Sequence, residues 1–110
     1  MPAIITVAYP RPSNPDAAFK FDYDHYYKVH MPLVQEIWGP RGLKSWMVTE
    51  HTDKDEPYFL QCKMDWDSVE DFKKAAASEE STKLFADVPN FTDLDLKILK
   101  GEIVRKWTIL

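Results

Sequence analysis

The sequence contains very little cysteine and glycine, with one Cys and three Gly among its 110 residues. A single thiol, Cys62, cannot form an internal disulfide, and in its alternating, strand-like run a buried thiol is an ordinary small hydrophobic side chain. No helix N-terminus or adjacent cation is evident that would lower the pKa of Cys62 and make it a nucleophile. We therefore expect a reducing, cytoplasmic setting and no thiol catalysis.

Motifs of nucleotide-binding and hydrolytic proteins are also missing. There is no G-x-G-x-x-G or P-loop sequence, which argues against a nucleotide cofactor, and no G-x-S-x-G sequence of a serine hydrolase. The formal net charge is -4 and no basic run is present, so we expect no DNA or RNA partner. Neither a signal-peptide pattern nor an apolar span able to cross a bilayer is visible, so we expect no membrane association.

Aromatic residues, in contrast, are abundant, with four Trp, five Tyr and six Phe. Their side-chain area must be buried in a core, a pocket or an interface, and we expect some of it to face a partner. A content of 45% apolar and 29% charged residues is typical of a globular protein. A chain of this length holds one modest core and not two, which predicts a single domain over residues 1–110.

Hydrophobic periodicity predicts four strands, two main helices and a short third helix. The strands are expected at residues 3–9, 43–51, 58–66 and 94–107, and the helices at 21–38, 69–76 and 78–87. A proline-rich loop at 10–20 leads to the first helix, which Asp22 can cap. We expect Pro89 to end the third helix and Gly101 to mark a bulge or a close backbone approach in the last strand.

The resulting β-α-β-β-α-β order is that of a ferredoxin-like α+β domain, with an antiparallel sheet that carries both helices on one face. The other face is then bare, although the strands are apolar on both faces. An exposed apolar sheet of this size is a liability for a monomer. Two sheets packed face to face in a symmetric homodimer would cover it, which predicts a dimeric α+β barrel.

The first helix carries a histidine, His30, in the middle of an aromatic and aliphatic face. The residues of this face recur at steps of three and four: Tyr23, Tyr26, Tyr27, His30, Leu33, Val34 and Ile37. Tyr26 lies one turn before His30, so the two rings can meet. Histidine titrates near physiological pH, and proton chemistry is therefore expected here.

Pro32 predicts an irregularity in this helix. A proline inside a helix removes one backbone hydrogen bond and crowds the carbonyl of Lys28. It also disfavours helical dihedrals at Met31, the preceding residue. We therefore expect the helix to kink or restart within about one residue of His30, which is compatible with a functional site and equally with a plain helix break.

The three histidines do not predict a metal centre. His25 and His30 are five residues apart, which places them about 140° apart on a regular α-helix and prevents them from binding one ion. His51 could approach from the second predicted strand, but no cluster of acidic or thiol ligands accompanies it. We therefore expect neither a metal nor any other cofactor.

The motif F-D-x-x-x-Y-Y-x-x-x-H-M-P-L-V, here Phe21 to Val34, followed by W-G-P-R-G-L-K-S-W, resembles the EthD family, named for a protein of ethyl tert-butyl ether degradation. This resemblance implies the dimeric α+β barrel fold. Similar barrels include muconolactone isomerases, cofactor-free polyketide oxygenases and haem-degrading or haem-binding proteins, with a cavity between sheet and helices in each subunit. Fold analogy of this kind does not assign a function by itself.

Three functions are compatible with these observations. The first is a small cofactor-independent enzyme of catabolic or secondary metabolism, of isomerase, dehydratase or oxygenase type, that acts on a hydrophobic cyclic or aromatic molecule by proton transfer. His30 would be the general acid or base, and Tyr26 would orient it or bind an oxyanion. The other two are a binding or accessory protein that supports a partner oxygenase, and a haem-binding barrel, for which no ligating residue can be assigned.

Each residue of the expected site also has a purely structural interpretation. His30 could be a core histidine bonded to a backbone carbonyl. The side chains expected to bind the substrate are Tyr23, Tyr27, Leu33, Trp46 and Trp66. Aromatic clusters of this kind are more often core, although cavities for apolar ligands are lined by similar side chains.

Overall fold

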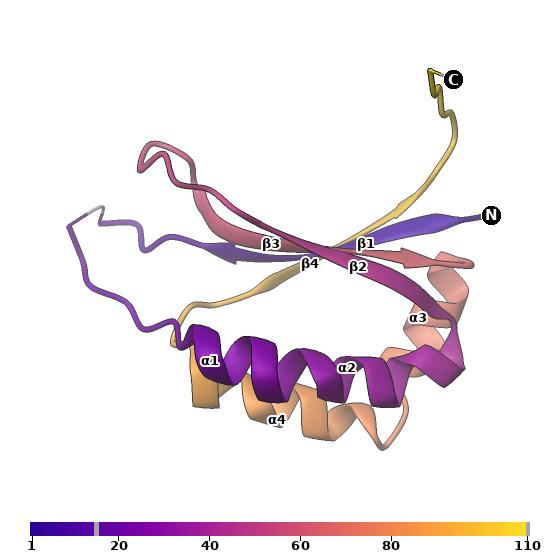
Figure 1. Cartoon of the computed structure of the whole chain (residues 1–110), viewed down its shortest axis with the longest axis horizontal. Coiled ribbons are helices and arrows are strands. Elements are labelled where there is room, and N and C mark those ends of the chain that lie inside the picture. Colours follow the sequence, from indigo (N-terminus) through magenta and orange to yellow (C-terminus); the bar gives the residue numbers. More distant parts are fainter. Residues whose placement is uncertain (15, 110) are drawn as a thin grey trace.

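A four-stranded antiparallel sheet carries its helices on one face (Figure 1). The computed structural model describes residues 1–14 and 16–109, so position 15 of the predicted proline-rich loop lies outside the described residues. The elements are β1 (Ala3–Pro10), α1 (Tyr23–His25), η1 (Tyr26–His30), α2 (Met31–Trp38), η2 (Gly39–Arg41), β2 (Leu43–Glu50), β3 (Tyr58–Trp66), α3 (Val69–Ala76), α4 (Ser81–Phe91) and β4 (Lys97–Glu102).

The strand order β2-β3-β1-β4 is that of a ferredoxin-like sheet and confirms the predicted α+β fold. β1 is central, with Val7 opposite Cys62 of β3 on one side and Ile98 of β4 on the other. Its β-branched and apolar side chains suit a position covered on both edges. The side chains of this central strand that face the helices form one side of the hydrophobic core.

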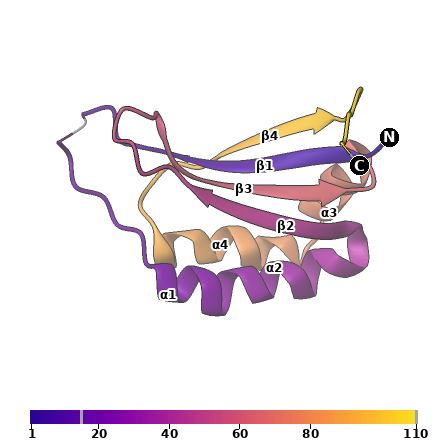
Figure 2. The same ribbon diagram turned by 45° about the horizontal axis from the view of Figure 1, so that its top comes forward.

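The helices form one layer against the sheet. α2 and α4 lie side by side along it, and α3 lies across one end (Figures 1 and 2). One end of the core is built from edge-to-face contacts among Trp38, Trp66 and Phe72. The other end is built around Tyr26 and Phe91, whose ring centroids are 5.1 Å apart. The helix layer thus leaves the opposite sheet face open.

The expected irregularity of the first helix is present within one residue of His30: it is a π-helical turn, η1, after which the α-helix starts again at Met31. Met31 has right-handed helical dihedrals, with φ −67° and ψ −38°, and its N–H donates to the carbonyl of Tyr26, five residues earlier. Pro32 then lies in the first turn of α2, where its missing N–H costs little. The wider turn accommodates the proline without breaking the helix.

The bounds of the last helix and of the last strand, and one expected bulge, differ from the prediction. α4 passes through Pro89 and ends at Phe91, because Phe91 is fully buried and the N–H of Thr92 still reaches the carbonyl of Val88. The last strand is shorter than predicted and ends at Glu102. At Gly101 the pairing with Ile4 continues in regular register, and a Cβ there would meet no atom closer than 4.0 Å, so this glycine marks neither a bulge nor a close approach.

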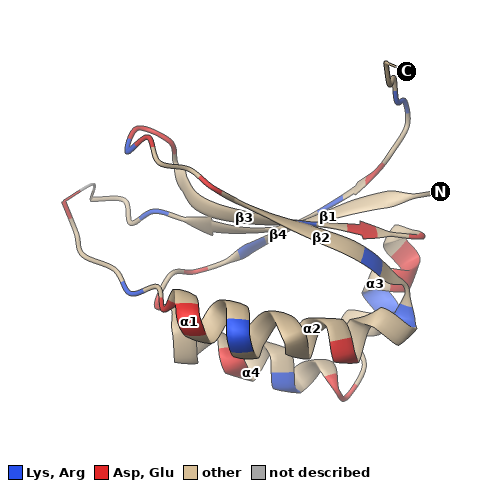
Figure 3. Ribbon diagram, in the orientation of Figure 1, with Lys and Arg blue, Asp and Glu red and all other residues tan. Residues whose placement is uncertain are grey.

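Charged residues of both signs are spread over the helices, loops and strand ends (Figure 3). The ion pairs that these residues form are mostly exposed, as for Lys44 with Asp67 and Arg41 with Glu80, and exposed pairs of this kind contribute little to stability. Within the described part of the chain, none of the helices has the length and apolarity that a bilayer span requires.

Candidate functional site

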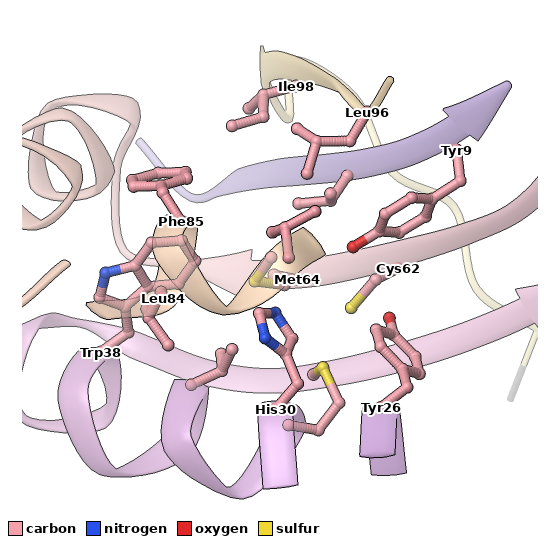
Figure 4. Close-up of a pocket in the computed structure, with 14 residues that line it drawn as sticks. Tyr9, Tyr26, His30, Trp38, Cys62, Met64, Leu84, Phe85, Leu96 and Ile98 are labelled. Atoms are coloured by element: carbon pink, nitrogen blue, oxygen red, sulfur yellow. The ribbon is translucent and has the colours of Figure 1, made fainter. Parts of the chain in front are cut away.

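A small cavity lies between the sheet and the helix layer (Figure 4). Its lining comes from β1, η1, α2, β3, α4 and the start of β4: Val7, Tyr9, Tyr26, His30, Met31, Val34, Trp38, Cys62, Met64, Leu84, Phe85, Val88, Leu96 and Ile98. The cavity volume is about 30 Å³, which is room for roughly one or two water molecules. The polar groups among these apolar walls therefore decide what the cavity can do.

His30 is held rigidly in the wall of this cavity. Its side chain is 9% exposed, and its ring stacks on Tyr26 with centroids 5.8 Å apart and planes 14° apart. Phe91 packs on the imidazole at 4.7 Å. The Nδ1 atom lies 2.9 Å from Oδ2 of Asp87 on α4. His30 is therefore bonded to a carboxylate and not, as in the structural interpretation, to a backbone carbonyl.

Asp87 binds a second histidine with its other oxygen. Oδ1 lies 2.9 Å from Nε2 of His25 and also accepts a hydrogen bond of 3.0 Å from the side-chain amide of Asn90. The π turn explains why His25 and His30 can share one carboxylate. Residues five apart lie about one turn apart where the helix has i to i+5 bonds, so the separation of about 140° that a regular α-helix predicts does not apply.

The pKa shifts of His30 and Asp87 determine which of the two side chains is charged at neutral pH. Burial lowers the pKa of His30, and this effect outweighs the hydrogen bond and charge of Asp87, which raise it. For Asp87, burial raises the pKa, but the hydrogen bonds from Asn90, His25 and His30 together bring it below its ordinary value. At neutral pH the carboxylate is therefore ionised and His30 is mainly neutral.

These protonation states determine the tautomer of His30. An ionised carboxylate only accepts hydrogen bonds, so Nδ1 of His30 must carry the hydrogen that faces Asp87. The other ring nitrogen, Nε2, then has a free lone pair. It makes no hydrogen bond to any described residue, and the ring lines the cavity. Nε2 is thus an available proton acceptor beside an apolar space.

Tyr26 contributes a buried hydroxyl that lies beside the thiol of Cys62, a weak hydrogen-bonding group, and makes no hydrogen bond of regular geometry to any described residue. Burial raises its pKa, so the group stays a neutral phenol. The hydroxyl points along the sheet toward Cys62 and Tyr9, and not toward the ring of His30 (Figure 4). Burial also raises the pKa of Cys62 to about 12, which keeps it a thiol. Tyr26 therefore supports His30 by stacking, and its O–H is engaged only weakly, by the thiol of Cys62.

The structure brings only two of the predicted site residues, His30 and Tyr26, to the cavity. Tyr23 and Tyr27 are exposed, and the Tyr23 hydroxyl donates to Glu50. Leu33 is half-buried against the core. Trp46 and Trp66 also lie outside the cavity: the indole N–H of Trp46 bonds to Gln35, and Trp66 packs in the Trp38 and Phe72 cluster.

Several residues of the site were missed by sequence reasoning. Cys62 and Met64 lie on the apolar face of β3 that the alternation predicts, so their position was available from the pattern. Tyr9 could have been placed on the inner face of β1 in the same way. Asp87 lies at the end of the predicted third helix, and no local pattern connects it with His30. Among the described residues, no group of three or more His, Cys, Asp or Glu side chains is arranged to hold a metal ion.

Comparisons with known proteins agree on one family and one fold. The model of the EthD domain matches residues 14–95. An EthD-like protein from Ralstonia eutropha JMP134 has 21% identity over 97% of this chain and 96% of its own, with a TM-score of 0.79. An ethyl tert-butyl ether degradation (EthD) family protein from Bacillus halodurans C-125 has 25% identity over 94% of this chain and 100% of its own, with a TM-score of 0.70.

A more distant structure is a dimeric ferredoxin-like protein of unknown function from Thermobifida fusca YX. It has 11% identity over 94% of this chain and 92% of its own, with a TM-score of 0.59. No curated protein matches the chain. The structural comparisons therefore agree with the ferredoxin-like fold described above.

Proposed function

Because the chain belongs to the EthD family of ferredoxin-like α+β barrels, we propose that it is a small enzyme in which His30 acts as a general base on a hydrophobic molecule bound in the cavity. One observation carries this proposal: Asp87 bonds Nδ1 of His30 and leaves Nε2 at the cavity. A carboxylate behind an imidazole fixes its tautomer and stabilises the imidazolium that forms when Nε2 takes a proton.

The proposed step is abstraction of a proton from a carbon next to a carbonyl group. Nε2 of His30 takes the proton, the C–H electron pair moves into an enolate, and the positive charge on the imidazole is stabilised by Asp87. The hydroxyl of Tyr26, engaged only weakly by the thiol of Cys62, is a suitable donor for the enolate oxygen. A positioned base of this kind is typically worth about 10²- to 10⁴-fold in rate. Isomerisation, dehydration and oxygenation can all begin with this step.

The lining of the cavity indicates the substrate class. Apart from His30, Cys62 and two tyrosines, the walls are aliphatic or aromatic, which favours a cyclic or aromatic compound with few polar groups. The present volume of about 30 Å³ is far below the roughly 300 Å³ of a typical ligand site. Phe85 lines the cavity, is 40% exposed and packs edge-on against Trp38, and the proposal requires its side chain to move aside when a ligand enters.

Hydrogen exchange at a carbon acid tests the proposed step directly. The protein is incubated in D₂O with a panel of cyclic and aromatic carbonyl compounds, and NMR follows deuterium incorporation next to the carbonyl. We expect incorporation into at least one compound and a loss of at least about a hundredfold in His30→Gln. His51→Gln is the matched control, since His51 lies outside the cavity.

Two results would contradict the proposal. Undiminished exchange in His30→Gln would exclude His30 as the base. A compound that binds in the cavity but never exchanges would instead indicate a non-catalytic binding or accessory protein.

We also propose that the chain forms a homodimer through the open face of its sheet. Met47 lies on this face, because its neighbour Trp46 points to α2, and Met47 is paired with Lys63 of β3. Met47 and Leu99 of the same face are 60% and 52% exposed. The Thermobifida fusca structure is described as dimeric, which supports a dimeric assembly for this chain as well. The face is less apolar than the sequence predicts, since Lys63 and Asp65 also lie on it.

A further inference from the structure

His25 and His30 are joined through the two oxygens of one carboxylate. The distance from His25 Nε2 to Asp87 Oδ1 and the distance from His30 Nδ1 to Asp87 Oδ2 are both 2.9 Å. The two rings differ in access to solvent, because the side chain of His25 is 25% exposed and that of His30 is 9% exposed. His30, which lines the cavity, is therefore connected through Asp87 to His25, which is more exposed to solvent.

We propose that His25 is a positioning residue that acts on His30 through their shared carboxylate. The protonation state of the partly exposed His25 then sets the basicity of His30 in the cavity. This inference deepens the proposed function, and its effect on catalysis rests on that function. Protonation of His25 places a positive charge on the far side of Asp87. That charge opposes a second positive charge on His30 and weakens the hold of the carboxylate on it.

The surroundings of the pair leave Asp87 as the main electrostatic link. On the helix side, the backbone N–H of His25 bonds to the carboxylate of Asp22, but its ring faces Asp87. On α4, Asn90 is neutral. The groups facing His30 from its own turn and from the sheet are Tyr26, Tyr9 and Cys62, which burial keeps uncharged because it raises the pKa of each. In agreement, the charge of His25 lowers the pKa of His30 and that of Asp87 raises it.

Asn90 makes this electrostatic role separable from a purely structural one. Its side-chain amide bonds the same oxygen of Asp87 as His25 does. Replacement of His25 therefore leaves one hydrogen bond to that oxygen and leaves the bond between Asp87 and His30 intact. A variant without the His25 charge is expected to keep the geometry of the cavity and to change only the titration of His30.

The test is an NMR titration of the histidine rings without any substrate. In the parent, the His30 resonances are expected to respond to two ionisations, its own and that of His25. In His25→Gln the His30 resonances should respond to a single ionisation, and the midpoint of the His30 titration should move to higher pH. His51→Gln is the control and should leave the His30 curve unchanged. A His30 curve in His25→Gln that matches the parent would overturn the proposal.

Asp87→Asn supplies a second measurement should His25→Gln fold poorly. Without the carboxylate, the midpoint of the His30 titration should move to lower pH, and the response of the His30 resonances to a second ionisation should largely disappear. A His30 curve in Asp87→Asn that matches the parent would contradict the link through Asp87.

The consequence for activity is tested separately from the coupling. A base must be neutral, so the exchange rate falls as the pH drops through the pKa of His30. In His25→Gln this acidic limb should move to higher pH in step with the NMR midpoint. If NMR shows the coupling but the exchange rate is the same in His30→Gln as in the parent, the proposed function is refuted and this inference stands. If the exchange rate depends on His30 but NMR shows no coupling, the proposed function stands and this inference is refuted.

Discussion

Asp87 of α4 holds His30 of η1 by a hydrogen bond of 2.9 Å to Nδ1, on the side of the ring that leaves Nε2 at the cavity. This contact joins the first helical segment to the last helix, and both partners are mostly buried. Buried charged groups are costly unless they are hydrogen-bonded, and Asp87 has three such partners. Such an arrangement stabilises charge that develops on the imidazole.

His30→Gln separates a functional histidine from a packed one. Gln has a similar volume and can keep a hydrogen bond to Asp87, so we expect a change of about 1 to 2 kcal/mol in the free energy of unfolding. Exchange activity or ligand binding should fall at least about a hundredfold. Chemical denaturation followed by circular dichroism gives the first quantity. An unfolded variant would show that His30 is a packing residue.

The stability of the protein should depend on pH through His30. Burial lowers the pKa of His30 in the folded state, so the folded protein binds this proton less readily than the unfolded chain. The contribution to stability is therefore complete above about pH 6.5 and is lost as the pH falls through the lower folded-state value. Denaturation at several pH values should show a steeper loss below about pH 6.5 in the parent than in His30→Gln. An equal loss of stability in the parent and in His30→Gln would mean that the pKa of His30 is the same in the folded and unfolded states.

Tyr26→Phe should affect function more than stability. The hydroxyl is buried and interacts only weakly with the thiol of Cys62, so its removal loses little internal hydrogen bonding, and we expect stability to change by less than about 1 kcal/mol. If the hydroxyl binds the enolate oxygen, exchange should fall by about 10²-fold. Tyr27→Phe, at an exposed tyrosine outside the cavity, is the matched control. A clear loss of stability would reveal a partner for the Tyr26 hydroxyl.

The homodimer should be disrupted by a charge on the open sheet face. Sedimentation of the parent should give about twice the chain mass of 12.9 kDa. Met47→Asp would bury an unpaired charge in the interface and should cost several kcal/mol, roughly 2 to 5. Val29→Asp changes an exposed valine of the helix layer and should leave the assembly intact. A monomeric parent, or a Met47→Asp protein that remains dimeric, would exclude this interface.

The purified protein should be colourless and should keep its fold in a chelator. The cavity lining offers one histidine, and its Nδ1 is bonded to Asp87, which leaves few ligands for haem or a metal ion. Visible absorbance, metal analysis and circular dichroism with a chelator check this expectation. A Soret band, a flavin spectrum or stoichiometric zinc would contradict it.

The fold was predictable from sequence because alternation and turn residues act locally. The β3 pattern with Cys62 and Met64 on one face is an example. The extension of α4 through Pro89 could not be predicted from sequence, because it depends on the burial of Phe91 in an aromatic cluster formed by residues distant in the chain. Propensity is a weak guide where packing of this kind decides the outcome.

The site was predictable only where one helix face defines it. His30 and Tyr26 share a face by simple periodicity, and both line the cavity. The link to Asp87 joins residues far apart in the chain, and no spacing rule finds it. The angle between His25 and His30 was misjudged because a regular α-helix was assumed where the chain forms a π turn.

The π turn also shifts the phase between the two halves of the first helix. It acts as one extra residue, so the segment before it is rotated by about 100° relative to a continuous α-helix. Winding Tyr26–His30 as a regular α-helix with no change in length would turn His25 away from Asp87 while Met31 to Trp38 kept their packing. Deletion of one residue between His25 and His30 would instead leave the two histidines four apart on a regular helix, again about one turn apart. The carboxylate bridge therefore depends on the winding of this segment and not on the number of residues between the two histidines.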